Sequence, residues 1–418
     1  MSPEHSGRTL FLVAAASLLC MSPWFSGTVV LPQLEQLWGA GIGLSAWLTM
    51  AVQLGFVAGG LISALFNLPD RFSAPRVFVV SSVGAAAVNA IFAAVAAEQP
   101  YTALAMRFLT GAFLAGVYPP GMKILAGWFR DPAQGGAGGR GTALGVLVGA
   151  LTVGKALPHG VFAVTDLPWR EVVLSGSVFA LAGAALIGLG VKEGPYAAPQ
   201  PPVDFHQIRE VFRNRGSRLA NFGYFGHMWE LYSMWGWVAL LLAASALRPA
   251  AAGSGSATGT PTHEVAWWAF AAIAAGGAGC VWAGRAADAG EAVSLEARVA
   301  RRARVTIVAM AVSGACCLLA ALLFQHFWLL VVICLVWGAA VVADSAQFST
   351  IVSEVSDRRY VGTALTVQTA VGFLLTVVSL RVIGAIGTTW GWDWAAASMA
   401  IGPALGILAM WRLARGSA

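Results

Sequence analysis

Four charged side chains lie deep inside long apolar stretches of this 418-residue chain: Glu230, Lys155, Asp344 and Arg107. A charge inside a bilayer costs about 2.5–3.5 kcal/mol on insertion scales, so it persists where it pairs, faces water or binds a ligand. A buried carboxyl group can carry a negative charge or take up a proton, and a lysine ammonium attracts a carboxylate or a phosphate. These residues therefore predict either structural ion pairs within a helix bundle or a polar route lined by titratable groups.

Polar neighbours at helical spacing favour the polar route. Lys155 shares a helix face with Thr152 and His159, and Glu230 shares one with His227, next to Tyr224. Two further stripes pair Asp344 with Gln347 and Thr49 with Gln53. We expect Glu230 to be the first candidate for a proton-carrying group and Asp344 the second, while Lys155 is the candidate anion ligand. His159 and His227 are equally compatible with titration near neutral pH and with hydrogen-bonded packing.

Two other charged residues within apolar stretches, Lys123 and Arg381, lie near the ends of their predicted helices. A helix rises about 1.5 Å per residue, so their long side chains reach the headgroup region from these positions. We expect both to extend to the membrane surface and to have no functional role.

Long apolar helices must position these side chains. The chain is 58% hydrophobic and 11% charged, with a mean hydropathy of +0.73, which excludes an ordinary soluble domain and a disordered chain. A membrane-spanning helix needs about 20 apolar residues. Twelve such runs are predicted, near residues 9–31, 43–66, 76–97, 101–129, 141–163, 171–191, 219–247, 264–284, 303–325, 328–353, 360–385 and 393–413. The expected fold class is an all-α membrane protein with twelve transmembrane helices.

The basic residues predict the orientation. With the N-terminus in the cytoplasm, 19 Lys and Arg residues fall in inner loops and tails or at the inner ends of the runs, and only Arg170 and Arg248 fall in outer loops. This asymmetry follows the positive-inside rule and predicts a multi-pass protein of the cell (inner) membrane with both termini cytoplasmic. The same asymmetry explains the net charge of +6 without a nucleic-acid partner.

The two halves of the chain repeat a short motif in the same register. Gly141-Thr142-Ala143-Leu144 opens the fifth run, and Gly362-Thr363-Ala364-Leu365 opens the eleventh. A parallel duplication places a solute site near the membrane midplane between two bundles. We therefore predict an N-terminal six-helix bundle (1–191), a cytoplasmic linker (192–218) and a C-terminal six-helix bundle (219–418).

This pattern resembles the major facilitator superfamily, whose halves share a Gly-x-x-x-Asp-Arg-x-Gly-Arg-like loop after the second and eighth helices. The chain has a partial first copy, Asp70-Arg71 through Arg76, and a second copy, Gly284-Arg285-Ala286-Ala287-Asp288-Ala289-Gly290. Arg107 through Gly111 is similar to the Arg-x-x-x-Gly pattern of the family's fourth helix. The resemblance implies transport by alternating access, a gating role for Asp70, Arg71, Gly284, Arg285, Asp288 and Gly290, and an Arg107 that ties its helix to neighbours or senses a coupling ion.

No motif for an enzyme, a cofactor or a metal is found in the sequence. The five cysteines lie in apolar runs without metal-ligand spacing, and neither Gly-x-Ser-x-Gly nor His-Glu-x-x-His occurs. We therefore expect no enzymatic activity and no cofactor.

The sequence-based hypothesis is a monomeric secondary carrier in the lipid bilayer that moves a small organic solute, coupled to protons by symport or exchange. Lys155 and Arg107 favour an organic anion. The first alternative is a proton-coupled efflux pump for cationic or neutral amphiphiles, in which Glu230 and Asp344 hold the compound and aromatic rings stack on it. The second is a non-transporting membrane sensor, which is disfavoured because the longest polar stretch, residues 192–218, is too short for a soluble output domain.

Overall fold

The structure is a computed structural model that describes residues 3–39, 42–66, 68–129, 140–196, 208–251, 262–289, 294–357 and 361–416. These residues form helices and connecting segments and include no strands. The expected all-α membrane fold is therefore confirmed.

The described residues of the N-terminal half form ten helices. They are α1 (Pro3–Cys20), α2 (Pro23–Val29), α3 (Leu31–Trp38), α4 (Ile42–Leu65), α5 (Leu68–Arg71), α6 (Ala74–Val95), α7 (Pro100–Leu114), α8 (Tyr118–Trp128), α9 (Arg140–Val164) and α10 (Trp169–Gly190).

A short helix, α11 (Ile208–Arg213), precedes the C-terminal half. That half consists of α12 (Arg215–Ala251), α13 (His263–Asp288), α14 (Leu295–Leu322), α15 (Phe327–Val341), α16 (Ser345–Val355), α17 (Val361–Thr389), α18 (Trp392–Met399) and α19 (Ile401–Gly416).

Eleven helical segments among the described residues are long and apolar enough to cross a membrane. The twelfth expected run, 101–129, is present but is divided into α7 and α8. Pro119 and Pro120 explain the division, because proline lacks an N–H and its ring clashes with the carbonyl group four residues earlier. Pro23 likewise stands at the start of α2, where the first run is divided.

The tenth run is also divided, between α15 and α16, but without a proline. Asp344 precedes the first residue of α16, and its main-chain oxygen accepts a hydrogen bond from the Gln347 N–H at 2.9 Å. The fourth and the tenth runs, each the fourth of its half, are thus both divided.

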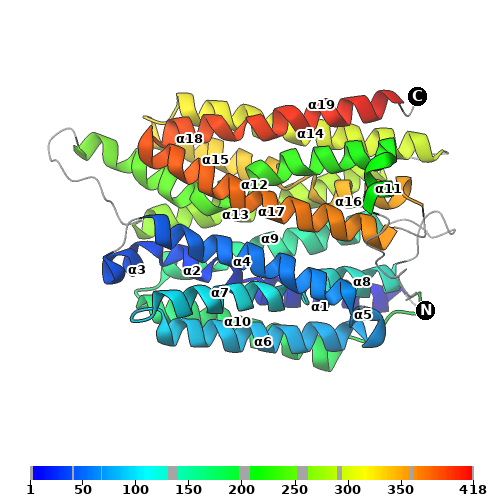
Figure 1. The fold of residues 1–418 in the computed structure, drawn as a ribbon, viewed down its shortest axis with the longest axis horizontal. Coiled ribbons are helices and arrows are strands. Elements are labelled where there is room, and N and C mark those ends of the chain that lie inside the picture. The colour runs from blue at the N-terminus through cyan, green and yellow to red at the C-terminus, as the bar shows by residue number, and fades with distance from the viewer. Residues whose placement is uncertain are drawn as a thin grey trace.

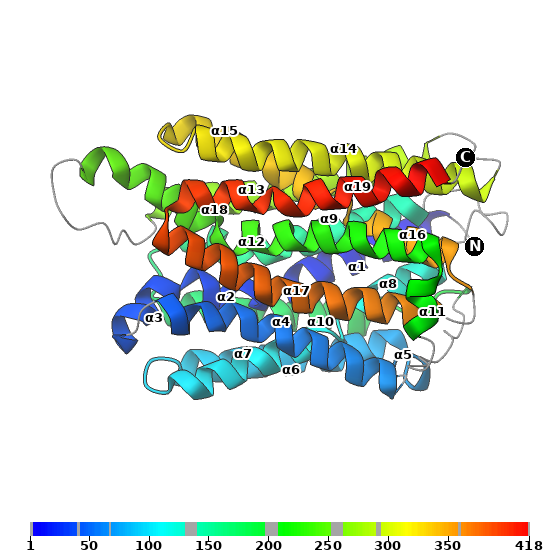
Figure 2. The same ribbon diagram turned by 45° about the horizontal axis from the view of Figure 1, so that its top comes forward.

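The helices run along the long axis of the molecule, and both termini lie at one end of it (Figures 1 and 2). We call this the terminal end and the opposite one the distal end. In Figure 1, helices α1 to α10 lie in the lower part of the view and α12 to α19 in the upper part. The most extensive contacts between the halves are those of α9 with α13 and of α4 with α17.

Glycines allow α9 and α13 to approach closely. A Cβ atom on Gly145 would lie 2.7 Å from the carbonyl oxygen of Cys280, and one on Gly149 would lie 2.9 Å from that of Gly277. Small residues at a helix contact let the two backbones pack against each other. This contact holds the two halves together along most of the length of α9.

Candidate functional site

A cavity of about 60 Å³ lies between the two halves. Seven aromatic residues line it: Trp24, Phe56, Tyr118, Tyr224, Tyr232, Trp235 and Phe373. The polar lining residues are Thr152, Lys155, His227, Ser345, Ser349 and Thr369, and Met21, Val148, Leu151, Met228, Leu231 and Val342 complete the wall. Pockets for organic ligands usually have volumes of about 300–1,000 Å³. The cavity is therefore in a closed form, with space for a few water molecules.

Lys155 of α9 lies in a cage of aromatic rings from both halves. Its Nζ is 4.3 Å from the centroid of the Trp24 ring, and 4.9 Å from those of Tyr232 and Trp235. The same Nζ donates a hydrogen bond of 2.7 Å to the Tyr232 hydroxyl. Among the described residues, no carboxylate lies within ion-pair distance of it. Cation–π contacts and one hydrogen bond thus take the place of an acidic partner.

Arg107 of α7 fixes the segment that carries Trp24. Its Nη1 donates to the carbonyl oxygen of Pro23 at 2.8 Å, and its Nη2 donates to that of Trp24. Pro23 and Trp24 are the first two residues of α2, so Arg107 binds the main chain directly after the break between α1 and α2. Nη1 also lies 3.2 Å from Ser26 Oγ and 3.3 Å from Asn89 Oδ1. Arg107 therefore ties the fourth run to the first and third, and it does not line the cavity.

His227 connects the cavity to Asp344. Its Nδ1 lies 2.8 Å from Asp344 Oδ1, and its Nε2 lies 2.8 Å from the hydroxyl oxygen of Ser345, another lining residue. Both His227 and Asp344 are buried. The arrangement places a carboxyl group and an imidazole in contact directly behind the cavity wall.

Glu230 lies inside the C-terminal half, away from the cavity. Its Oε1 accepts hydrogen bonds from Trp337 Nε1 at 2.6 Å and Cys317 Sγ at 3.2 Å, and its Oε2 accepts one from Ser313 Oγ at 3.0 Å. Although Glu230 shares α12 with His227 and Tyr232, its side chain faces α14 and α15. The sequence predicts that His227 and Glu230 face the same polar route, but in the structure only His227 of these two lines the cavity.

The two glutamines also lie outside the cavity lining. Gln347 accepts a hydrogen bond of 2.8 Å from Arg302 Nη1, so it faces α14. The side-chain amide of Gln53 is fully buried in α4, and neither of its polar atoms has a hydrogen-bond partner among the described residues. Thr152 does line the cavity, and its hydroxyl donates to the carbonyl of Val148 at 2.8 Å.

His159 lines a second small cavity, of about 50 Å³, one helical turn beyond Lys155 towards the distal end. Residues of both halves surround it, including Glu35 and Phe162 from the N-terminal half and Trp237 from the C-terminal half. His159 is buried, and among the described residues neither of its ring nitrogens has a hydrogen-bond partner. The predicted stripe of Thr152, Lys155 and His159 is thus divided between two cavities.

At the terminal end, Asp288 of α13 contacts the first turn of α9. Its Oδ2 accepts hydrogen bonds from the Thr142 N–H at 2.9 Å and from Thr142 Oγ1 at 3.3 Å. A carboxylate is favourable there, because the N-terminus of a helix carries unpaired N–H groups and a partial positive charge. A Cβ atom on Gly141 would lie 2.2 Å from Asp288 Oδ1, so glycine leaves room for this contact.

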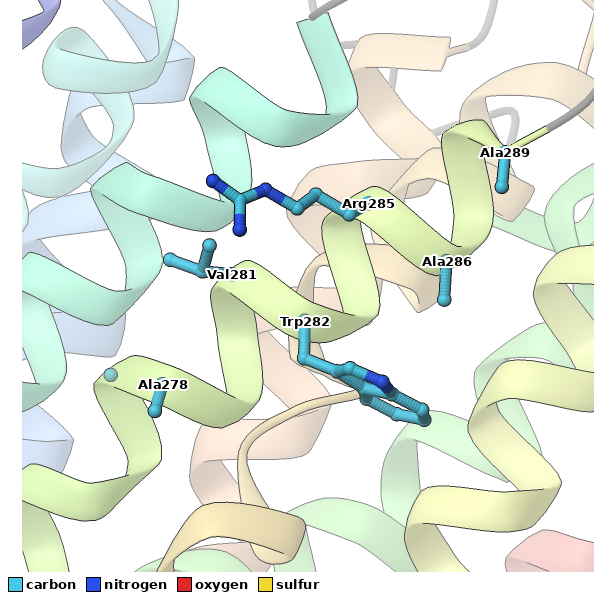
Figure 3. A pocket seen from close by; sticks show the side chains of 7 residues that line it. Ala278, Val281, Trp282, Arg285, Ala286 and Ala289 are labelled. Atoms are coloured by element: carbon cyan, nitrogen blue, oxygen red, sulfur yellow. The ribbon is translucent and has the colours of Figure 1, made fainter.

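The other predicted gating residues lie nearby or outside the described part of the chain. Gly284 packs against the carbonyl of Gly141, with 3.0 Å between that oxygen and a Cβ built on Gly284. Arg285 and Trp282 of α13 both line an open hollow of about 710 Å³, and Figure 3 shows their side chains extending in different directions from the helix. Arg71 is exposed at the end of α5. The side chain of Asp70 and the whole of Gly290 lie outside the described residues.

Sequence reasoning missed several residues of these sites. Trp24 carries one wall of the Lys155 cage, yet it is an ordinary aromatic residue in an apolar run. The Pro23 that precedes it is the signal that could have marked a helix break at this position. Trp337, Ser313 and Cys317 were also missed as partners of Glu230, and no spacing in the sequence connects them to it. Among the described residues, no group of three or more His, Cys, Asp or Glu could hold a metal ion.

Comparisons with known proteins agree with this geometry. A family model described as Major Facilitator Superfamily matches residues 12–253. Among solved structures, the crystal structure of the human organic anion transporter MFSD10 (TETRAN) is similar to this chain, with a TM-score of 0.68 and 15% sequence identity. The match covers 98% of this chain and 100% of that one, and at this identity it supports the fold. No curated protein matches the chain.

Proposed function

The chain belongs to the Major Facilitator Superfamily and is a multi-pass membrane transporter, and we propose that it moves a small organic anion across the cytoplasmic membrane by alternating access. The observation that carries the anion proposal is the Lys155 ammonium in the central cavity, with no carboxylate as a partner among the described residues. A lysine in this position offers a compact positive charge to an entering carboxylate.

The lining of the cavity supports an anion over a cation. Among the described residues that line it, Lys155 is the one Lys or Arg, and none is an Asp or Glu. The rival hypothesis, an efflux pump for cationic amphiphiles, needs Glu230 or Asp344 to hold the compound. Glu230 is hydrogen-bonded within the C-terminal half, and Asp344 contacts His227 behind the wall.

The closed cavity supports alternating access. Contacts between the halves occur at both ends of α9: Thr142 with Asp288 at the terminal end, and a stacked pair of rings, Phe162 and His263, with centroids 5.4 Å apart, at the distal end. An organic solute can enter only when one of these ends separates. We propose that the halves, residues 1–191 and 219–418, rock about the central cavity, and that the terminal end faces the cytoplasm, as the basic loops indicate.

For the coupling ion we propose a proton carried by the pair of Asp344 and His227. This pair touches the cavity through His227 and Ser345, so a change of its charge acts directly on a bound solute. Glu230 is the second candidate. A proton bound there would act through the packing of α12 against α14 and α15.

A thermal-shift screen of the purified protein tests the substrate class. A ligand at 100 times its Kd adds about 2.7 kcal/mol of stability, which is readily measured as a rise in Tm. We expect organic carboxylates to raise the Tm of the wild type and of Lys123→Met, and to have no effect on Lys155→Met. If hydrophobic cations raise the Tm instead, and Lys155→Met still responds to them, the efflux-pump hypothesis replaces this one.

Uptake into proteoliposomes tests the coupling. We expect Asp344→Asn to bind solute and to exchange it across the membrane, but to lose the acceleration that a pH gradient gives the wild type. If Asp344→Asn keeps that acceleration and Glu230→Gln loses it, Glu230 carries the proton.

A further inference from the structure

The rings around Lys155 point to the kind of anion that the cavity accepts. We infer that the substrate is a monocarboxylate with a planar aromatic body, held by the Lys155 ammonium at one end and by stacking between rings of the two halves. This inference rests on the proposed function and adds the chemical class of the solute.

The first step concerns the ring contacts across the interface between the halves. Trp24 lies 5.8 Å from Tyr232 and 5.8 Å from Phe373, and Phe56 lies 4.5 Å from Phe373, measured between ring centroids. Trp24 and Phe56 belong to the N-terminal half, and Tyr232 and Phe373 to the C-terminal half. Pairs at these separations attract each other beyond the burial of their area.

Opening the cavity must separate these ring pairs. The closed cavity of about 60 Å³ is too small for an organic solute, so the two sets of rings have to move apart before a solute can bind. A flat aromatic body inserted between them makes new ring contacts with both halves. A saturated ring of the same size fills the same space without the matching charge distribution of a π system.

The second step concerns the charge. The faces of Trp24, Tyr232 and Trp235 already surround one ammonium group, that of Lys155. A cationic ligand would meet that ammonium and be repelled, whereas a carboxylate can bind it. Because the described lining holds one Lys and no Arg, a second carboxylate on the solute would meet hydroxyl groups, His227 and ring surfaces rather than a second Lys or Arg. One negative charge is therefore favoured over two.

The third step concerns how the cage is held. Arg107 fixes the main chain on both sides of Trp24, and the Tyr232 hydroxyl fixes the Lys155 ammonium. Binding of a carboxylate exchanges the contacts between Lys155 and Tyr232 for contacts with the solute. The cage thus holds the Lys155 ammonium between rings of both halves, and an entering carboxylate replaces the contact between this ammonium and Tyr232.

Isothermal titration of the purified full chain tests this inference with benzoate, cyclohexanecarboxylate, terephthalate and benzylammonium. Benzoate is expected to bind at least about tenfold more tightly than cyclohexanecarboxylate, which corresponds to one or two ring contacts. Terephthalate is expected to bind more weakly than benzoate, and benzylammonium not to bind. In both Trp24→Leu and Trp235→Leu the ratio of the first two affinities should fall towards one. The exposed Trp328→Leu is the matched control and should keep the ratio of the wild type.

The outcomes separate this inference from the function on which it rests. If benzoate and cyclohexanecarboxylate bind equally and Lys155→Met abolishes both, the carrier takes anions and the aromatic class is wrong. Tighter binding of terephthalate than of benzoate would refute the single charge. Binding of benzylammonium, with no binding of any carboxylate, would refute the proposed function itself. Thermal unfolding of each variant shows whether it is folded. Because Trp24 and Trp235 are replaced separately, the inference can still be tested if one of the two variants does not fold.

Discussion

The contact between Asp288 and the first turn of α9 predicts how firmly the terminal end is closed. The perturbation is Asp288→Asn, which keeps an acceptor oxygen but removes the negative charge. A hydrogen bond to a charged group contributes about 1.5–3 kcal/mol and one between neutral groups about 0.5–1.5. A charge at a helix N-terminus adds about 0.3–1 kcal/mol. The expected loss is therefore roughly 1.5–2 kcal/mol of closed-state stability, which shifts the ratio of closed to open molecules about 10- to 30-fold.

Two further variants at the same contact should change the ratio of closed to open molecules by different amounts, which can be compared with the effect of Asp288→Asn. Thr142→Val removes the 3.3 Å bond from Oγ1 and leaves the 2.9 Å bond from the main-chain N–H. Because 3.3 Å is long for an O–H···O hydrogen bond, we expect this bond to contribute only about 0.5 kcal/mol, so its loss should shift the ratio about two- to threefold. Gly141→Ala should act like Asp288→Asn, because the added Cβ must displace the carboxylate oxygen that lies 2.2 Å away.

Pulsed electron spin resonance between labels on the two halves measures the ratio. Lys192, directly after α10 of the N-terminal half, and Glu296 of α14 are exposed at the terminal end. All five native cysteines are free and buried, which favours labelling at two cysteines introduced at these positions. The population at long label separations should increase in the order wild type, Thr142→Val, Asp288→Asn. Identical distance distributions in all three proteins would refute the role of Asp288 in closing this end.

Three further predictions follow from buried contacts. Arg107→Met removes the hydrogen bonds of a charged donor to two buried main-chain carbonyls, each contributing about 1.5–3 kcal/mol, so its Tm should fall by several degrees and its anion affinity should drop; an unchanged Tm would contradict this. Glu230→Gln should lower the Tm, because three donors lose a charged acceptor, but it should leave the Kd of the anion unchanged in titration. A higher Kd for the anion would place Glu230 at the solute. Gly149→Val places side-chain atoms against the carbonyl of Gly277, and this overpacking costs about 1–3 kcal/mol. We expect uptake into proteoliposomes to be about 5- to 150-fold slower, and an unchanged rate would show that α9 and α13 need not approach so closely.

Hydropathy predicts the helices of this protein well, because each membrane-spanning helix must satisfy its own backbone hydrogen bonds with apolar side chains outside. The run 101–129 was predicted as one span, and its division into α7 and α8 follows from Pro119 and Pro120. The division before α16 has no such marker. There the chain breaks at Asp344, whose carboxylate contacts His227 on a different helix.

The partners of the polar residues were harder to predict than their positions. Periodicity placed Glu230 and His227 on one face of α12, but that face is wide enough to meet two different neighbours. His227 meets the cavity and Glu230 meets Trp337 of α15. Helix periodicity gives the direction of a side chain relative to its own helix, and the packing of the other helices decides what it contacts.

Lys155 illustrates what the sequence and the structure each contribute to the description of the site. A lysine near the middle of an apolar run must be explained, and its charge alone indicated an anion. The cage around it joins Trp24 of α2 with Tyr232 and Trp235 of α12, and no pattern in the sequence connects these residues. The motif after the eighth run gives Asp288 a gating role by resemblance, and this role stays a prediction; in the structure Asp288 lies at a contact between the halves.

The position of a bound solute tests the central claim most directly. A structure of the purified protein with a saturating aromatic monocarboxylate, determined by electron cryomicroscopy, would show it. We predict that the carboxylate lies within about 2.7–2.9 Å of the Lys155 Nζ, between the rings of the two halves, and that the hydrogen bond from Nζ to Tyr232 is lost or shared. A carboxylate bound elsewhere, with Lys155 still enclosed by Trp24, Tyr232 and Trp235, would contradict it.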